Sequence, residues 1–535
     1  MKNLERIVIK IISIIFSIFF SIVLLNTLFF NRTIAFNYSI PVMIIVTALA
    51  YLILLIIYYE YKKKNCSFLE KSPKWIFGLF IFLVIFLLQF LLAKFSYTSC
   101  GWDCSLVINN ALALINGDDL FSIYFSRYPN NIGILLLMKY LFEFFKIFIH
   151  NLTASRVFFI ATIFNIVVVD ISAVFTFLCA KKILGKKQAY LSLIFILPLM
   201  IFSPNILIPY TDTITMVFPI MILYLYIKQK EKSCKDVKKY LLIFLNSIIT
   251  AFGITLKPTV AIMPIAIIIV EILNINNIKF TRQEFIKKSK YILIIIAIFV
   301  IGLGGYFSGY SKIKEKNLGN IISKEEYENN SVSFVHFLMM GMQERPNDFK
   351  TEGKNQTLYG AYNENDVSGT VAITGSKAKK EHNIKIIKER LKDFGVLGYS
   401  KFLYNKANWI LSDGTFFYGQ EGYWNSEIFY NKSNIAKKVQ KFVDPTTKIY
   451  KNITANIMQI SWILVTIGLI FSNNRKENKK NIDMCKITII GIILFILLFE
   501  GRSRYLINHI PIFILVGTYG LTNSLRKIIL TFKHK

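Results

Sequence analysis

Long apolar runs without charged residues constrain this chain more than any other feature. Residues 11–30 hold no charged side chain, and about 20 apolar residues suffice for a helix to cross a hydrocarbon core of about 30 Å. In lipid, every backbone polar group must be bonded internally, so spanning segments are helices or closed barrels. Barrel strands are about ten residues long and alternate in polarity, which these runs do not. The sequence therefore predicts an all-α polytopic integral membrane protein.

Twelve apolar blocks of this kind follow one another along the 535 residues, of which 54% are hydrophobic. They predict about 12 transmembrane helices near residues 8–30, 39–59, 75–94, 155–179, 188–208, 212–228, 240–256, 258–275, 291–309, 454–472, 487–500 and 505–524. The first block is long for a signal-peptide core, and no small-x-small cleavage site follows it. We therefore expect it to remain as the first span.

The basic residues, which give a net charge of +31, indicate orientation rather than a nucleic-acid partner. They gather in short bursts between apolar blocks, and alternate loops are nearly free of them. Because cytosolic loops carry the excess of Lys and Arg, we expect the basic loops on the cytosolic side, with both termini. These loops are 60–74, 181–187, 228–239, 282–290 and 475–480. The many Ile, Lys and Asn residues are typical of an AT-rich bacterial genome, so a bacterial plasma membrane is expected.

Two longer segments interrupt the spans, and the loop parity predicts both on the outer side. Residues 131–147 contain the i, i+4 pair Lys139 and Glu143, so we expect an interfacial helix there rather than a span. The predicted organisation has four parts. They are two N-terminal spans (1–74), a membrane core (75–309) with a first outer loop (95–154), a mainly helical outer subdomain (310–453) and C-terminal spans (454–535).

Acidic residues at the expected outer ends of helices are candidates for proton transfer. Asp103 directly follows an outward-going helix in GWDC and is suited to act as a general base toward an acceptor hydroxyl. The alternative is an exposed loop carboxylate. Asp212 begins an expected helix between threonines, where it either caps the helix or faces the same cavity as Asp103.

Basic residues on the outer side break the charge pattern and are candidates for phosphate binding. Lys257 interrupts an apolar hairpin, and Arg502 and Arg504 lie in the turn before the last span. A guanidinium presents a planar fork that matches phosphate oxygens. Arg127 opens the interfacial helix and is a further candidate. The alternatives are contacts with lipid headgroups or, for the two C-terminal arginines, a structural pair with Glu500.

The remaining chemistry of the sequence is limited. Cys100 and Cys104 lie close together on the expected outer side, where either a disulfide or two free thiols fit the sequence. No cysteine spacing fits a zinc site, and a requirement for a divalent metal is left open. The sequence lacks a Walker motif, a GxGxxG that opens a helix and a nucleophile elbow, so it offers no obvious site for cytosolic ATP or nucleotide-sugar chemistry. The unexpected polar residues all lie on the expected outer side.

This layout resembles the GT-C superfamily of membrane glycosyltransferases, especially the protein-mannosyltransferase-like and aminoarabinose-transferase-like branch. The matching features are Trp102-Asp103, the stretches 105–116 and 131–147, Tyr128-Pro129, Arg156 and Ser503-Arg504-Tyr505. The chain departs from the pattern where Cys104 follows Asp103, where Asn130 replaces a second proline, and where two spans precede the family core.

The resemblance implies a lipid-phosphate-dependent hexosyltransferase that inverts the anomeric carbon of a sugar carried on a polyprenyl phosphate. Asp103 would be the base, and Lys257, Arg502 and Arg504 would hold the carrier phosphate. The other residues expected in the substrate site are Arg127, Tyr128, Asp212 and Tyr505. The expected partners are the lipid-linked donor, membrane lipids and a surface acceptor, namely a wall polymer, glycolipid or protein. The alternatives are a flippase for lipid-linked sugars and a polymerase or ligase of lipid-linked glycans.

Overall fold

The computed structural model describes residues 2–30, 38–63, 75–231, 233–275, 282–346, 357–419, 428–473 and 479–533. Parts of three predicted basic loops, namely 64–74, 232 and 475–478, lie outside the described residues.

The protein is an all-helical, multi-pass membrane protein. Ten helical segments in the described part of the chain are long and apolar enough to span a membrane. Six are formed by the single helices α1 (Lys2–Phe29), α2 (Ile40–Lys63), α8 (Ala154–Ile183), α12 (Asp236–Leu256), α14 (Arg282–Leu318) and α21 (Lys479–Leu498). Two further predicted blocks coincide with the apolar helices α4 (Trp75–Ser96) and α13 (Ile262–Ile275), which are not among these ten. All twelve predicted blocks thus coincide with helical segments, and ten of these are candidate spans in the described part of the chain.

The other four spans are built from consecutive helical pieces. The first joins α9 (Lys186–Ile196) to the turns η2 (Leu197–Ile201) and η3 (Pro204–Leu207), and the second joins α10 (Thr211–Ile214) to α11 (Val217–Gln229). The third joins η6 (Tyr450–Ala455) to α20 (Asn456–Ile470), and the fourth joins η7 (Ser503–His509) to α22 (Ile510–Lys533). Proline lacks a backbone N–H, which explains the breaks at Pro198 and Pro204. Asn165 Nδ2 donates to the carbonyl oxygens of Ile206 and Ile208 at 2.8 and 3.3 Å, so the interrupted backbone is bonded inside the bundle.

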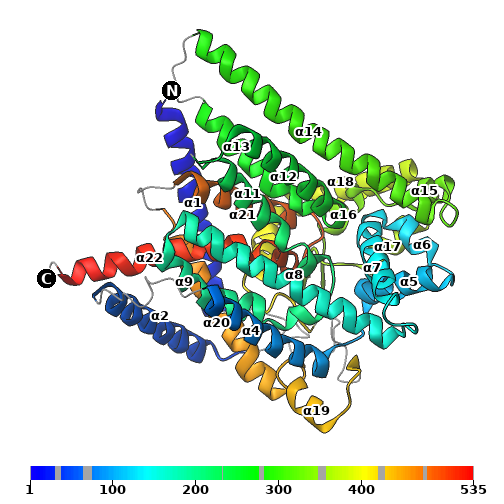
Figure 1. Cartoon of the computed structure of the whole chain (residues 1–535), viewed down its shortest axis with the longest axis horizontal. Helices are drawn as coiled ribbons and strands as arrows, with labels where there is room; N and C mark the ends of the chain where they lie inside the picture. Colours follow the sequence, from blue (N-terminus) through cyan, green and yellow to red (C-terminus); the bar gives the residue numbers. More distant parts are fainter. Residues whose placement is uncertain are drawn as a thin grey trace.

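Short helices gather at one end of the bundle, which we call the loop end (Figure 1). They include α5 (Trp102–Asn116), α6 (Ser122–Arg127), η1 (Pro129–Asn131) and α7 (Ile132–Lys146). Both chain termini lie toward the opposite end (Figure 1). The helix predicted at 131–147 is α7, and it is not among the ten spans. It lies against α12, where a Cβ on Gly133 would come within 2.1 Å of the Thr255 carbonyl oxygen.

The segment 310–453 also belongs to the loop end. After the end of α14 it forms α15 (Lys324–Asn330), α16 (Phe334–Met340), β1 (Glu344–Pro346), β2 (Thr357–Tyr359), α17 (Glu364–Val371), α18 (Ser376–Leu411) and α19 (Asn434–Gln440). The two strands pair antiparallel, and the rest of the described segment is mainly helical, as the sequence predicts. The 3-10 turn η4 (Pro258–Ala261) joins α12 to α13, and the turn η6 (Tyr450–Ala455) leads from this segment into α20.

Candidate functional site

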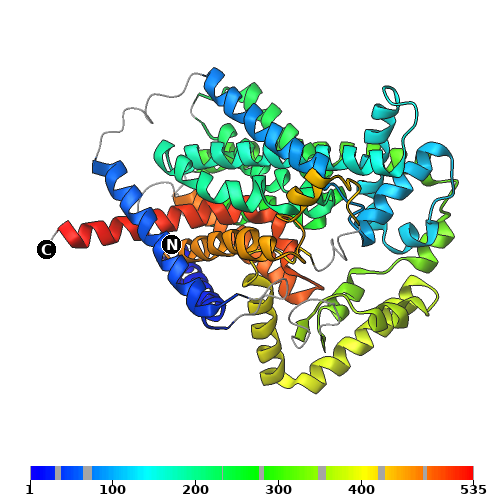
Figure 2. The same cartoon turned by 90° about the horizontal axis from the view of Figure 1, so that it is seen from below.

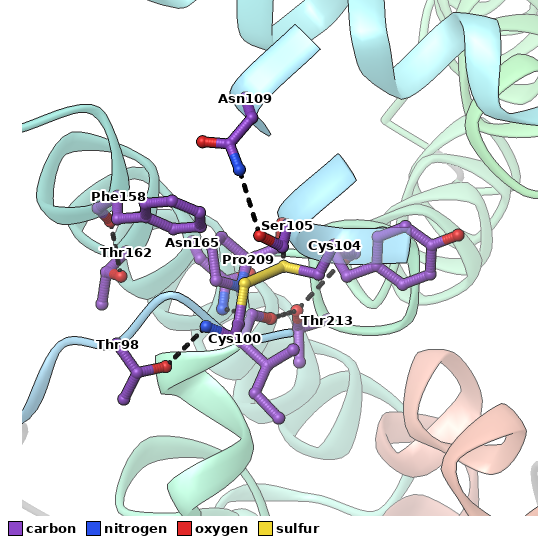
Figure 3. The surroundings of a disulfide bond; sticks show 12 residues. Thr98, Cys100, Cys104, Ser105, Asn109, Phe158, Thr162, Asn165, Pro209 and Thr213 are labelled. Carbon is purple, nitrogen blue, oxygen red and sulfur yellow. Dashed lines mark hydrogen bonds between the residues drawn. A yellow bond between two sulfur atoms is a disulfide. The ribbon is translucent and has the colours of Figure 1, made fainter. Parts of the chain in front are cut away.

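A tight disulfide-closed turn carries the residue predicted as the general base. Cys100 and Cys104 are joined by a disulfide, which decides between the two alternatives that the sequence left open (Figure 3). The turn is fixed further because the Cys100 N–H donates to Thr98 Oγ1 at 2.9 Å. Cys100 and Trp102 both have positive φ, 47° and 33°, which is uncommon for residues with a side chain. The backbone that enters α5, and with it Asp103, is therefore strongly constrained.

Asp103 lies in a network of hydroxyl and amide groups. Tyr124 Oη donates to Asp103 Oδ1 at 2.6 Å, and Asn131 Nδ2 donates to Tyr124 Oη at 2.6 Å. Tyr210 Oη lies 3.0 Å from Asn131 Oδ1 and 3.5 Å from Asp103 Oδ2. Burial, together with the Asp103 carboxylate, holds the pKa of Tyr124 and of Tyr210 well above the usual value. Both phenols therefore stay protonated and can donate hydrogen bonds to the carboxylate.

A buried ion triad forms beside this network. Asp212 is 5% exposed and accepts a charge-assisted hydrogen bond from Lys257 Nζ on one oxygen. Its other oxygen accepts from an Arg504 guanidinium nitrogen at 2.6 Å. Three segments far apart in the sequence thus meet at one carboxylate. Asp212 makes no helix-capping hydrogen bond in α10, so its role is the ion triad rather than the cap.

Aromatic rings surround the cations of the triad. The Arg504 guanidinium lies 4.1 Å from the ring centre of Trp102 and 5.0 Å from that of Tyr505. Lys257 Nζ lies 4.8 Å from the Tyr505 ring centre, and Trp102 packs edge-on against Tyr210 at 5.3 Å. Cation–π contacts stabilise a desolvated cation. Because Trp102 precedes Asp103 directly, these rings join the ion triad and the Asp103 network into one site.

A small cavity of about 20 Å³ lies between these groups. This is room for about one water molecule, so a larger ligand requires the lining side chains to move apart. Trp102, Phe416 and Phe417 line the cavity together with Asp212 and Arg504. The same three aromatic residues have positive φ, with Phe416 at 57° and Phe417 at 63°. Strained backbone of this kind concentrates at functional sites, which supports a functional interpretation of the cavity.

Comparison with protein families identifies the group to which this chain belongs. Residues 4–525 match a family model described as "Conserved hypothetical integral membrane protein". The protein belongs to this family. No curated protein matches the sequence. Among solved structures, the crystal structure of ArnT from Cupriavidus metallidurans bound to undecaprenyl phosphate is similar over 84% of this chain and 76% of that chain, at 10% sequence identity and a TM-score of 0.33.

In this family member the C-terminal arginines have different partners. Arg504 pairs with Asp212, whereas Arg502 Nε lies 3.8 Å from Glu500 Oε1. Tyr505 Oη donates to the other Glu500 oxygen at 2.7 Å. Burial, followed by the charge of Arg504, lowers the pKa of Arg502 to about 9. The structural pair with Glu500 that the sequence allowed thus exists for Arg502, while Arg504 lines the cavity.

Two of the predicted site residues, Tyr128 and Arg127, lie at the edge of the candidate site. The Tyr128 ring is 5.3 Å from that of Tyr124, and burial raises the pKa of Tyr128 to about 12, with Asp103 contributing. Arg127 ends α6, and its side chain is half-buried. Among the described residues, no hydrogen bond or ion pair joins the Arg127 side chain to Asp103 or to the ion triad. Its role in the site stays a prediction.

Several residues of the site were not singled out from the sequence. Tyr124 carried no signal beyond its nearness to Arg127. Asp413 accepts from Ser503 Oγ at 2.9 Å and from the Phe417 N–H at 2.6 Å, which ties segment 310–453 to the C-terminal turn. The polar sequence Ser412-Asp413-Gly414 after an expected helix was the available signal for it. The described part of the chain contains no cluster of three or more His, Cys, Asp or Glu side chains suited to a metal ion.

Proposed function

We propose that this protein transfers a sugar from a polyprenyl-phosphate carrier to an acceptor hydroxyl at the loop end, on the outer face of the membrane. The observation that carries the proposal is that the half-buried Asp103 shares one site with the Lys257–Asp212–Arg504 triad. The two are connected through Tyr210 and Trp102. A base for the acceptor and cations for a phosphate leaving group are both required by such a reaction. A reaction of this kind would make the protein a lipid-phosphate-dependent hexosyltransferase of the GT-C type.

Asp103 is assigned as the general base. The acceptor oxygen attacks the anomeric carbon and forms the new glycosidic bond while the bond from that carbon to the phosphate oxygen breaks. Asp103 takes the proton of the acceptor hydroxyl, and the phosphate stays on the polyprenyl chain with the electron pair. The hydrogen bond from Tyr124 at 2.6 Å orients the carboxylate, and geometry is the first requirement for a general base.

Lys257 and Arg504 are assigned to the carrier phosphate, with Tyr505 and Arg502 beside them. Together Lys257 and Arg504 carry two positive charges against the one carboxylate of Asp212, which leaves one positive charge. A sugar linked through a phosphodiester carries one negative charge, so the donor and the triad match. A diphosphate carrier, which the polymerase or ligase alternative requires, brings more negative charge than the triad offers.

Two measurements test the proposal. First, the purified protein in nanodiscs is titrated with polyprenyl monophosphate, and Lys257→Met is compared with the wild type. A hydrogen bond to a charged group is worth about 1.5–3 kcal/mol, so binding is expected to weaken by about tenfold or more. Second, a panel of radiolabelled polyprenyl-phosphate hexoses is offered with a cell-envelope acceptor fraction, and Asp103→Asn is compared with the wild type. Asp118→Asn, at an exposed carboxylate of the same loop, is the matched control.

The expected result is transfer by the wild type and Asp118→Asn, and a loss of about 100-fold or more in Asp103→Asn, within the usual range for a general base. Equal transfer by Asp103→Asn and the wild type removes Asp103 from its role. If labelled donor crosses a vesicle bilayer without any transfer, the flippase alternative replaces the proposal.

A further inference from the structure

Helix α18 bends sharply and presents two apolar side chains at the bend. Gly395 has φ 57° and ψ −178° inside the helix, a conformation that favours glycine. The two residues after it, Val396 and Leu397, are 84% and 86% exposed. They are the most exposed large hydrophobic side chains of the described chain. We call residues 395–398 the elbow.

The elbow is held open by aromatic packing on its inner side. The Phe394 and Phe402 rings lie 5.2 Å apart, and Tyr399 stacks on Phe402 at 6.0 Å. Phe394 precedes the bend, whereas Phe402 follows it, so these rings join the two arms of α18. Because the aromatic residues fill the inner side of the bend, Val396 and Leu397 remain on its outer side.

The second arm of α18 is the part that follows the elbow, residues 399–411, and the first arm is the part before it. The second arm lies at the level where two spans end. Tyr404 Oη is hydrogen-bonded to Asn26 near the end of α1, with Asn26 Nδ2 at 2.8 Å. Lys406 Nζ donates to the carbonyl oxygens of Leu497 and Phe499, at 3.1 and 2.6 Å, where α21 ends. The contacts of this arm thus lie at the boundary between the spans and the loop end, which is where a membrane interface falls.

From these contacts the arm runs outward to the elbow. At 1.5 Å per residue, the distance along the helix from Lys406 to Leu397 is on the order of 14 Å. Figure 2 shows the arm (yellow) crosswise to α22 (red) and projecting from the bundle to a corner. A helix crosswise to a span runs along the plane of the membrane, and the elbow lies at the outer end of this arm, beside the bundle.

The charges around the elbow fit a lipid surface. Residues 385–401 contain five basic and two acidic side chains, and Lys392 and Lys401, on either side of the elbow, are exposed. Helices that lie in a membrane interface combine an apolar face with basic residues that meet anionic headgroups. Apolar side chains at the tip and lysines behind it follow the same arrangement.

We propose that the elbow is a membrane anchor, in which Val396 and Leu397 insert into the headgroup and acyl boundary of the bilayer at the loop end. The partner is the lipid surface itself. The anchor fixes the distal end of the second arm, whose other end leads to Asp413 and its hydrogen bond with Ser503. The bilayer surface thereby supports the segment that reaches the candidate site.

The test measures the depth of the elbow in lipid. Val396→Trp and Leu397→Trp are prepared as separate variants, with Glu381→Trp at an exposed position of the first arm as the matched control. Each protein is placed in nanodiscs of phosphatidylcholine and phosphatidylglycerol, with and without bromine near the top of the acyl chains. Tryptophan emission above that of the wild type is recorded, and aqueous iodide is the second quencher.

An anchor inserted about 5–10 Å below the headgroups predicts that brominated lipid lowers the emission added by Val396→Trp and Leu397→Trp by about half. Iodide is expected to have little effect on them, while Glu381→Trp responds to iodide and not to bromine. The proposal is wrong if the elbow variants respond to iodide as Glu381→Trp does. It is also wrong if neither quencher acts on them, because the elbow is then covered by protein, such as a second copy of the chain.

Discussion

The buried carboxylate of Asp212 allows a sharp test of the ion triad. Asp212→Asn keeps the size of the side chain and one carbonyl oxygen but removes the negative charge. Lys257, 9% exposed, and Arg504 then both lose the carboxylate to which they are hydrogen-bonded. Removing one partner of a buried ion pair typically costs about 3–5 kcal/mol, because the remaining charge is desolvated and uncompensated. We expect a loss of stability of this size.

The expected loss translates into a measurable change in melting temperature. Unfolding entropies of about 2.1 cal/mol/K per residue, taken over 535 residues, convert it into a fall in Tm of about 3–4 °C. The assay is thermal unfolding of the purified protein in one detergent at one protein concentration. Asp118→Asn at an exposed carboxylate is the control, and it should melt within about 1 °C of the wild type, as surface substitutions usually do.

A double variant separates the triad from a general effect of the substitution. Adding Lys257→Met to Asp212→Asn removes one of the two cations that lost this carboxylate, so the double variant should melt above Asp212→Asn. Contacting residues show such coupling, whereas independent sites simply add. The reasoning is refuted if Asp212→Asn melts with the wild type, or if the two substitutions destabilise additively.

Two further predictions concern groups at the loop end. Burial lowers the pKa of His336 to about 4 from the usual 6.5. As the pH falls below 6.5, the unfolded state therefore takes up a proton before the folded state does. The free energy of unfolding should fall by up to about 3 kcal/mol between pH 6.5 and pH 4. The Tm should change less with pH across this range for His336→Asn than for the wild type. Equal slopes of Tm against pH in the two proteins would show that His336 is not responsible. For the disulfide, a reductant should lower the stability of the wild type by about 2 kcal/mol, as expected for a short closed loop. The same reductant should leave the Tm of a Cys100→Ser, Cys104→Ser double variant unchanged, and a fall in both proteins would show that it acts elsewhere.

The helices of this protein follow from its sequence alone. In lipid each backbone N–H and C=O must be bonded within its own segment, so an apolar block of span length determines a helix without knowledge of its neighbours. The same rule explains why the sequence points to Asp212, Lys257 and Arg504. A charged residue near an apolar block is costly in lipid, and it stands out for that reason.

The pairing of those charged residues was decided only by the tertiary structure. Lys257 and Arg504 both pair with Asp212, whereas Asp103 contacts hydroxyl groups of Tyr124 and Tyr210 instead. The sequence suggested a general set of phosphate-binding residues, with Arg127 among them. It gave no indication that one carboxylate would already compensate part of their charge.

Packing decides these contacts because spans that are apolar on most faces do not specify which face meets which neighbour. In a membrane the lipid tails are as apolar as the side chains, so association depends on close packing and polar contacts between helices. The bend of α18 was also not predicted from the sequence. A glycine inside a helical pattern is visible in the sequence, but its positive φ is seen only in the structure. The sequence by itself therefore determined the spans and their unusual charges, and the tertiary structure alone brought those charges into one site.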